Sequence, residues 1–371
     1  MSANGLRVLV IGAGAGIFRA HRAGLEAIGA RVVGVQDVDP DRVERVADEL
    51  ECPGHTETAE LLEIPADLAV ILAPHPFHAP LTIACLHAGL HVLVEKPIAI
   101  QVAEADAMAE EADRCGRVLA VAFQQRTRPE VLEARRLVDQ GFLGELQHAA
   151  LLSTWPRRHA YFDLGPWRGS WRGEGGGVLL NQGEHDLDLL CYLAGAPATV
   201  FGWTRTRMHP VETEDTVEAI LQWSSGAVGS VHISTAEVDE AQRIELTGSR
   251  GRLRLLPGRL EATRNREDFR EYAASMGDPF QGPEPGELSV FEGAGNGHED
   301  LYRDLARALG TGLAPIAPAR EATRALELAN AIILSSKSGE VVGLPLDRPR
   351  YGALLRDLQE RSGTHELTRS R

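Results

Sequence analysis

Several features are scarce in this chain of 371 residues. It has only four cysteines (Cys52, Cys85, Cys115 and Cys191), and they show no metal-ligand spacing, which favours reduced thiols in a cytoplasmic protein over a metal site. Positive charge is outweighed, because the formal net charge is −15, so nucleic acid and anionic membrane are disfavoured as partners. No apolar run is long enough to span a membrane, and no repeat or low-complexity segment is visible.

The remaining composition, with 43% hydrophobic and 25% charged residues, is typical of a soluble globular enzyme. A chain of this length exceeds one ordinary hydrophobic core, so we expect two domains. The first five residues carry no basic leader and no cleavage site, which again favours the cytoplasm.

A glycine-rich turn follows the first apolar segment. Residues 6–12 are nearly all apolar, as in a strand buried on both faces, and Gly12, Gly14 and Gly16 then precede an amphipathic stretch. A second strand over 30–35 ends beside Asp37. This order favours a dinucleotide-binding unit over a plain tight turn, with the pyrophosphate at the helix N-terminus. The Asp37 carboxylate would accept from ribose hydroxyls and repel a 2'-phosphate, which favours NAD over NADP. Ile17 replaces the usual third glycine or alanine, so we expect Gly16 to take the close-packing role.

Helical and strand-like segments then alternate, with helices over 41–50, 81–88 and 103–114 and strands over 68–73, 91–95 and 118–123. The alternation predicts a doubly wound parallel sheet, in which ligands bind beyond the carboxyl ends of the strands. Lys96 follows one of these strands and would point its ammonium into that crevice; the alternative is a solvated lysine paired with Glu95. For His78, a helix-capping or core role agrees with the sequence at least as well as contact with a substrate does. The predicted cofactor contacts are Gly12, Gly14, Gly16, Ile17, Phe18, Asp37, Ala73, Pro74, His75, His78, Glu95, Lys96, Pro97 and Gln124.

The second half of the chain has a different pattern. Strand-like alternation begins at Leu146, and further strands are predicted over 199–207, 216–223, 228–234, 243–247 and 252–256. They indicate an open, mainly antiparallel sheet with one face available to a second subunit, as in a homodimer or homotetramer. A long helix is expected over 319–335, and the charged last residues are expected to form a surface extension. The predicted domains are therefore 1–124, 125–345 and 346–371.

The residues most suited to chemistry in this half lie between 155 and 188. After the triple glycine 175–177, residues 178–190 read as one buried helix, on which Asn181 and His185 share a face and Asp188 could orient the imidazole. A neutral histidine there could take a proton from an alcohol as hydride leaves; the alternative is a core histidine bonded to Asp188. Upstream lies a cluster suited either to a polyhydroxylated ring or to anchoring a loop or subunit: Trp155, Tyr161, Trp167, Arg168 and Trp171.

Together these motifs resemble the glucose-fructose oxidoreductase, inositol dehydrogenase and rhizopine-catabolism family of NAD(P)-dependent oxidoreductases. The resemblance covers almost the whole chain and rests on the glycine turn, Glu95-Lys96-Pro97, Arg126 with Pro129, the triple glycine, Gly183-x-His185-x-x-Asp188 and the segment 339–346. It implies a Rossmann domain followed by an α/β domain whose open sheet forms the oligomer interface.

The resemblance also implies hydride transfer at a carbinol of a sugar or cyclitol. Inositol dehydrogenase-like members use a lysine, an aspartate and a histidine; Lys96 and His185 match the first and last, whereas Asn181 replaces the aspartate. We therefore expect His185 to be the base and Lys96 the polarising partner. An enzyme that retains NAD and cleaves glycosides after transient oxidation, and a non-catalytic NAD-binding protein, are the alternatives. The expected substrate contacts are Lys96, Arg126, Trp155, Tyr161, Trp167, Arg168, Trp171, Asn181 and His185; no metal ligand is expected.

Overall fold

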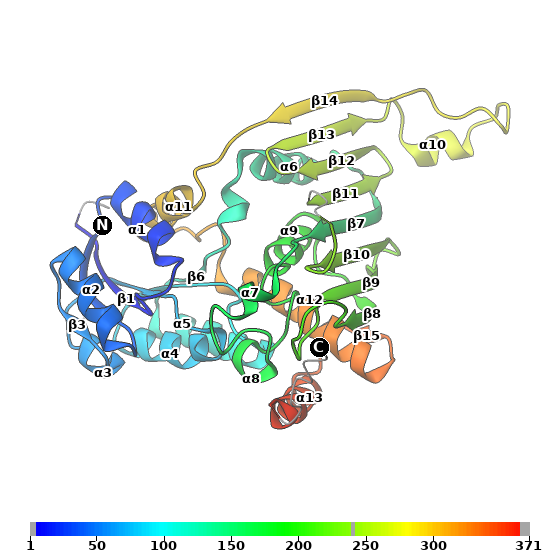
Figure 1. Ribbon diagram of the computed structural model, residues 1–371. Helices are drawn as coiled ribbons and strands as arrows, with labels where there is room; N and C mark the ends of the chain where they lie inside the picture. Colours follow the sequence, from blue (N-terminus) through cyan, green and yellow to red (C-terminus); the bar gives the residue numbers. More distant parts are fainter. Residues whose placement is uncertain (1–4, 239–241, 364–371) are drawn as a thin grey trace. The chain divides into compact units, whose positions relative to one another are not determined.

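The computed structural model describes residues 5–238 and 242–363, which form two compact units (Figure 1). Unit 1 comprises residues 1–127, 172–175 and 296–326, and unit 2 comprises residues 128–171, 176–295 and 327–371. After residue 127 the chain therefore re-enters unit 1 twice, whereas the predicted domains 1–124, 125–345 and 346–371 are consecutive ranges. Residues 1–4 and 364–371 lie outside the described residues. The expectation that the first residues carry no leader, and the end of the expected surface extension, fall in these two segments.

Unit 1 is built on a parallel six-stranded sheet in the order β3-β2-β1-β4-β5-β6, which confirms the predicted doubly wound fold. Apart from the exposed Arg7 at the start of β1, the residues of its two central strands, β1 and β4, are apolar and almost inaccessible, as expected when helices cover both faces. The strands are β1 (Arg7–Ile11), β2 (Arg31–Gln36), β3 (Gly54–His55), β4 (Leu68–Ile71), β5 (His91–Val94) and β6 (Leu119–Val121). The helices are α1 (Phe18–Ala27), α2 (Pro40–Leu50), α3 (Thr58–Leu61), α4 (His78–His87), α5 (Val102–Cys115) and α11 (His298–Thr311), with 3-10 turns η1 (His75–Phe77) and η2 (Gln124–Thr127).

Close helix packing in unit 1 depends on Gly24 rather than on Gly16. Helices α1 and α11 pack against each other, and a Cβ placed at Gly24 would lie 2.2 Å from Cδ2 of Tyr302. At Gly16 a Cβ would meet nothing within 4 Å, and Ile17 beside it is 41% exposed. The expectation that Gly16 takes the close-packing role is therefore wrong: the tight contact lies further along the helix, where α11 crosses it.

Unit 2 contains a nine-stranded sheet in the order β14-β13-β12-β11-β7-β10-β9-β8-β15. Only the β7–β10 pair is parallel, so the predicted open, mainly antiparallel sheet is confirmed. Burial alternates along the strands, because one face packs on helices such as α6 and α9. The strands are β7 (Leu146–Thr154), β8 (Thr199–Arg205), β9 (Thr216–Gln222), β10 (Val228–Ser234), β11 (Arg243–Gly248), β12 (Gly251–Leu256), β13 (Arg259–Arg264), β14 (Glu287–Glu292) and β15 (Val342–Gly343).

The helices in this half of the chain include one at the end that the sequence did not predict. They are α6 (Pro129–Asp139), α7 (His159–Phe162), α8 (Trp171–Glu174), α9 (Glu184–Ala194), α10 (Phe269–Ala274), α12 (Ala319–Ser338) and α13 (Arg348–Arg361). Tyr351 and Leu355 of α13 are buried, so this part of the predicted surface extension is an amphipathic helix packed on the protein. Among the described residues, no helix is long and apolar enough to cross a bilayer.

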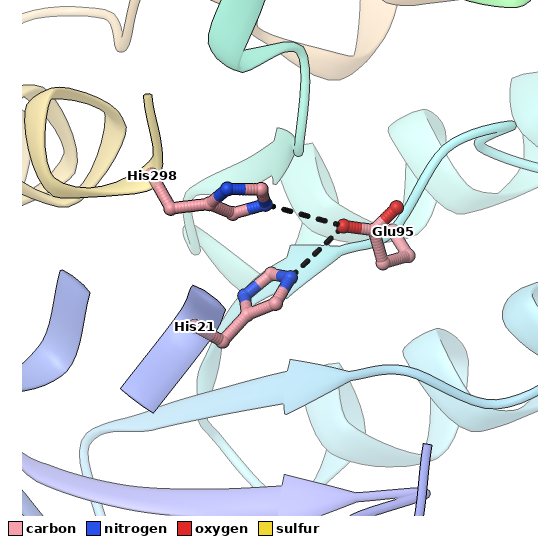
Figure 2. Close-up of side chains that lie close together, drawn as sticks. All are labelled: His21, Glu95 and His298. Carbon is pink, nitrogen blue, oxygen red and sulfur yellow. Dashed lines mark hydrogen bonds and ion pairs between the residues drawn. The ribbon is translucent and has the colours of Figure 1, made fainter. Parts of the chain in front are cut away.

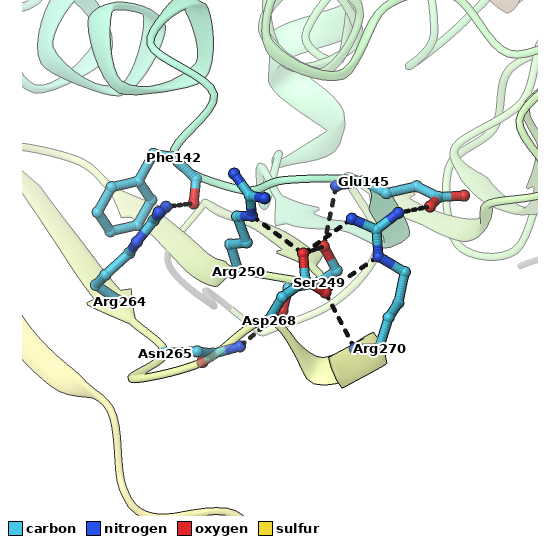
Figure 3. A network of polar contacts seen from close by, with 8 residues as sticks. All are labelled: Phe142, Glu145, Ser249, Arg250, Arg264, Asn265, Asp268 and Arg270. Atoms are coloured by element: carbon cyan, nitrogen blue, oxygen red, sulfur yellow. Dashed lines mark hydrogen bonds and ion pairs between the residues drawn. The ribbon is translucent and has the colours of Figure 1, made fainter. Parts of the chain in front are cut away.

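Asp268 anchors the start of α10 (Figure 3). Its carboxylate accepts hydrogen bonds from Ser249 Oγ at 3.1 Å, Arg250 Nε at 3.0 Å and Arg270 Nε at 3.1 Å. The hydrogen bond from Arg270 is the main reason why the pKa of Asp268 lies well below its ordinary value. This network ties α10 to the turn between β11 and β12. It includes none of the predicted substrate contacts.

Candidate functional site

In unit 1 the strand order reverses between β1 and β4, and the glycine turn begins at that point. Gly12 has a φ of 79°, and a Cβ there would lie 2.8 Å from the backbone nitrogen of Ala73, which follows β4. Only glycine therefore fits between the ends of the two strands. In open α/β sheets the crevice at such a switch point is the ligand site. The structure thus brings Gly12 and Ala73, both predicted cofactor contacts, to one place.

Asp37 follows β2 and faces the same turn. Its Oδ2 accepts a hydrogen bond from the Gly14 backbone at 2.9 Å, and its Oδ1 accepts one from the Asp39 backbone at 3.1 Å. A Cβ at Gly14 would lie 2.7 Å from Asp37 Oδ2 and 2.6 Å from Cδ of Arg42, so a side chain there would displace the carboxylate. The turn therefore holds a carboxylate beside the backbone amides expected to receive a pyrophosphate, an arrangement that fits a dinucleotide with free ribose hydroxyls.

The loop after β4 is joined to the turn after β5 by His78. The ring nitrogens of this fully buried histidine lie 2.7 Å from the Pro97 carbonyl and 2.7 Å from the Ala73 carbonyl. Burial lowers the pKa of His78, and the hydrogen bonds to the two carbonyls oppose that effect. These contacts favour the core role for His78. His75 is also buried, and its Nδ1 lies 3.2 Å from the Glu174 carbonyl.

Glu95 lies in a polar cluster inside unit 1 (Figure 2). Its Oε1 is 2.9 Å from Nε2 of His21 and 3.8 Å from Nε2 of His298, while Nδ1 of His21 is 2.9 Å from the Tyr302 hydroxyl. Burial alone would raise the pKa of Glu95, but the hydrogen bond with His21, the proximity of His298 and the charge of Lys96 hold it well below its ordinary value. Burial lowers the pKa of His21, so a neutral ring donates from Nε2 and accepts from Tyr302.

This cluster fixes the backbone next to Lys96. Oε2 of Glu95 accepts from the Lys96 backbone nitrogen at 3.1 Å, so the carboxylate that holds His21 also holds the lysine's own peptide. The donor atoms of His21, Glu95 and His298 lie within 4.8 Å of one another, a set that could also ligate a divalent cation. Sequence reasoning missed both histidines. His298 is about two hundred residues from Glu95, and no local pattern links them.

Two predicted contacts follow β6. Gln124 begins η2, and its carbonyl accepts from the Thr127 hydroxyl at 2.7 Å. Arg126 is only 1% exposed, and its Nη1 donates to the Ile316 carbonyl at 2.9 Å and to Glu321 Oε2 at 3.2 Å. These are contacts within unit 1, so Arg126 joins η2 to the segment before α12. Its role as a substrate contact stays a prediction.

In unit 2 the residues 178–183 form successive turns, and α9 begins only at Glu184. The prediction of one helix over 178–190 is therefore wrong, and Asn181 does not share a helical face with His185. The turn is set by Gly183, whose backbone nitrogen donates to the Val178 carbonyl at 2.7 Å and whose Cβ would lie 3.0 Å from Ile233. His185 is half-buried in the first turn of α9.

The triple glycine is held by Glu214. Its Oε1 accepts from the backbone nitrogen of Gly177 at 2.8 Å and from that of Leu179 at 3.3 Å. A Cβ at Gly177 would lie 2.0 Å from the Glu214 carbonyl oxygen, so only glycine fits. Burial raises the pKa of Glu214 to about 7, against the opposing backbone hydrogen bonds. Glu214 therefore positions the segment that leads to Asn181 and His185.

Tyr161 connects the aromatic cluster to this segment. Its hydroxyl donates to Oδ1 of Asn181 at 3.3 Å and accepts from Nε2 of Gln182 at 3.0 Å and from Nη1 of Arg168 at 2.6 Å. The Arg168 guanidinium also stacks on the Trp167 ring, 4.3 Å from its centroid. Tyr161, Trp167 and Arg168 were predicted from the aromatic cluster and Asn181 from the segment after the triple glycine, and the structure brings them together within unit 2.

Trp155 and Trp171 differ in their surroundings. Nε1 of Trp155 donates to Oδ2 of Asp186 at 2.8 Å, and burial raises the pKa of Asp186 to about 6. Trp171 is 5% exposed, its backbone nitrogen donates to Glu212 at 3.3 Å, and the ammonium of Lys337 lies over its ring. Trp155 is thus tied to the helix that carries His185, whereas Trp171 has the surroundings of an anchor; a substrate contact by either stays a prediction.

Comparison with known proteins agrees with this architecture. Residues 6–123 match the family model described as "Oxidoreductase family, NAD-binding Rossmann fold", and residues 131–254 match the "GFO/IDH/MocA C-terminal domain". The chain is 29% identical to scyllo-inositol 2-dehydrogenase (NAD(+)) of Bacillus subtilis over 66% of this chain and 72% of that one.

Two further similar proteins have names that include a nucleotide sugar. The chain is 31% identical to a protein of Amycolatopsis mediterranei assigned provisionally as the oxidoreductase subunit of UDP-kanosamine synthase, over 57% of this chain and 56% of that relative. The chain thus spans little more than half of that relative's length. Among solved structures, the WlbA dehydrogenase of Chromobacterium violaceum in complex with NADH and UDP-GlcNAcA superimposes with a TM-score of 0.79 at 26% identity, over 94% of this chain and 98% of that one.

Proposed function

The chain belongs to the GFO/IDH/MocA family of NAD-binding oxidoreductases, and on this basis we propose that it is a dehydrogenase that oxidises a secondary hydroxyl of a sugar, glycoside or cyclitol to a ketone. The observation that carries the proposal is the placement of Lys96, which follows β5 at the carboxyl edge of the parallel sheet and whose backbone nitrogen donates to the half-buried carboxylate of Glu95. The inositol and nucleotide-sugar relatives support the substrate class.

The residues divide between two tasks. Of the predicted nucleotide contacts, Gly12, Gly14 and Asp37 lie at the glycine turn of unit 1, where the Asp37 carboxylate accepts from the Gly14 backbone. The predicted substrate contacts Trp155, Tyr161, Trp167 and Arg168 lie in unit 2 with Asn181 and His185. When bound, NAD supplies the nicotinamide carbon that accepts the hydride.

In the proposed reaction, His185 takes the proton of the substrate hydroxyl while the carbinol hydrogen leaves as hydride, and a ketone remains. The Lys96 ammonium lowers the proton affinity of that hydroxyl and stabilises the developing negative charge. Asn181 hydrogen-bonds the substrate without adding a charge, since it replaces the aspartate of inositol dehydrogenase-like members. Asp186 lends no support to the glycoside-cleaving alternative, because its carboxylate is engaged by Trp155 and Gln242.

The experiment is a spectroscopic assay for NADH with a panel of inositols, aldoses, glycosides, uronides and nucleotide sugars. At least one compound should yield NADH, and Lys96→Ala should reduce its kcat/KM by about a hundredfold or more, as expected for loss of a group that acts on charge in the transition state. NAD binding by the variant, followed by protein fluorescence quenching, is the control. A variant that binds NAD and turns over like the wild type would contradict the role of Lys96.

We also propose that the protein acts in the cytoplasm as a homodimer or homotetramer. The face of the unit 2 sheet opposite α6 and α9 carries exposed apolar side chains, among them Trp203 at 43%, Ile220 at 56% and Val228 at 50% exposure. Several exposed apolar side chains on one sheet face are a feature of subunit interfaces. Ile220→Lys should shift the molar mass measured by light scattering toward the monomer; an unchanged mass would oppose this arrangement.

A further inference from the structure

The loop before α8 is basic in an otherwise acidic protein. We call residues 155–168 the arginine loop, because they contain Arg157, Arg158 and Arg168 but only one acidic residue, Asp163, whereas the whole chain has a net charge of −15. All of these residues belong to unit 2. A local excess of positive charge of this kind attracts anionic ligands.

Two of the arginines lie against one tyrosine ring. The guanidinium carbon of Arg157 is 5.1 Å from the centroid of Tyr161, and that of Arg168 is 4.5 Å from it. Arg157 also lies over Trp155 at 6.0 Å, and Arg168 lies over Trp167 at 4.3 Å. Stacking fixes the planes of both guanidinium groups, and the N–H donors of a guanidinium lie in that plane, which is the geometry that suits a carboxylate or a phosphate.

Arg157 has few polar partners of its own. Its Nη1 donates to the Pro156 carbonyl at 3.1 Å, and its Nε is buried without a hydrogen-bond partner in the described part of the chain. Among the same residues, no ion pair joins Arg157 to a carboxylate. Two positive groups that share one ring repel each other, and a bound anion would relieve that repulsion.

The stacked pair is connected to the predicted reaction centre. The Tyr161 hydroxyl that accepts from Arg168 also donates to Asn181, which precedes His185 by four residues in the sequence. An anionic substituent held by Arg157 and Arg168 would therefore place the attached sugar ring near Asn181.

We propose that Arg157 and Arg168 bind an anionic substituent of the substrate, so that the protein acts on acidic rather than neutral sugar derivatives. The substituent is a carboxylate or a phosphate, since the same donor edges recognise both. The inference rests on the proposed function for the identity of the site, but it concerns binding and is measurable without turnover.

The test is calorimetric titration of the NAD-saturated protein with matched probes: methyl β-glucoside as the neutral compound, methyl β-glucuronide for a carboxylate, and glucose 1-phosphate and UDP-glucose for phosphates. At least one anionic probe should bind about tenfold or more tightly than the neutral one, as one charge-assisted hydrogen bond would provide. Preference for the glucuronide assigns a carboxylate, and preference for the phosphates assigns a phosphate or diphosphate.

Variants separate recognition from folding. Arg157→Met should remove most of the anionic preference by lowering affinity for the anionic probe alone, and Arg168→Met should do the same. Arg158→Met is the matched control, because it removes one exposed charge from the same loop, whereas the stacking contacts among the described residues of this loop are made by Arg157 and Arg168. Its ratio of anionic to neutral affinity should stay within about twofold of the wild-type ratio, as for a screened surface charge.

Three outcomes would overturn the inference: equal affinity for neutral and anionic probes, no binding by any anionic probe, or equal losses of neutral and anionic binding in Arg157→Met. NADH formation distinguishes this failure from failure of the proposed function. A protein that oxidises neutral sugars without anionic preference refutes only the inference, and one that prefers anions but never forms NADH refutes only the dehydrogenase.

Discussion

Substitution of Glu214 by glutamine should change how the stability of unit 2 depends on pH. In the native protein, burial raises the pKa of Glu214 from an ordinary 4.5 to about 7, so the folded state holds this proton more tightly than the unfolded state does. The resulting stabilisation is fully present below pH 4.5 and is lost as the pH rises through 7. At 1.36 kcal/mol per pH unit, the difference between the two values corresponds to about 3 kcal/mol.

Urea unfolding followed by tryptophan fluorescence measures this effect selectively, because all five tryptophans lie in unit 2. We expect the unfolding free energy of the wild type minus that of Glu214→Gln to fall by about 3 kcal/mol between pH 4.5 and pH 8, since glutamine keeps the acceptor for Gly177 but does not titrate. Glu267→Gln, which removes an exposed carboxylate of unit 2, is the control and should show no such trend. A difference that is independent of pH, or that grows with pH, would refute the reasoning.

Three further outcomes are expected. Gly24→Ala should destabilise the protein by about 1–3 kcal/mol in thermal unfolding followed by circular dichroism, because its Cβ would overlap Tyr302; an unchanged midpoint would count against that packing. Asp37→Ser should raise the affinity for NADP relative to NAD about tenfold or more in fluorescence titrations, and an unchanged ratio would mean that the carboxylate does not face the ribose. The emission of Trp155 should change near pH 6 as Asp186 titrates, and Asp186→Asn should abolish that change; a transition that persists in the variant must come from another group.

The parallel sheet of unit 1 could be predicted because its signals are local. The apolar run before Gly12, the glycine turn and the acid after the second strand lie within about thirty residues, and each has one structural reading in that context. The packing of α1 could not be predicted, because it depends on contact between Gly24 and Tyr302, which are far apart in the sequence. The same holds for His298 beside Glu95.

In unit 2 most strand positions were predictable, but the order of the strands in the sheet and two segments were not. β13 and β14 pair with each other across an intervening helix. β14 is exposed along its whole length and so lacks the buried alternation used to find strands, whereas β13 alternates in burial and was missed. The start of α9 was also misplaced, since residues 178–183 are as apolar as a buried helix but are turned by Gly183 and by the contacts of Gly177 with Glu214. Tertiary contacts, rather than local propensity, decide both cases.

The measurement that tests the central proposal most directly is the stoichiometry of one reaction. With the best substrate of the panel, NADH is measured by absorbance and the sugar product by nuclear magnetic resonance. The account predicts one NADH for each ketone formed, and loss of both products in Lys96→Ala. A cleaved glycoside without NADH, or no product from any compound of the panel, would contradict it.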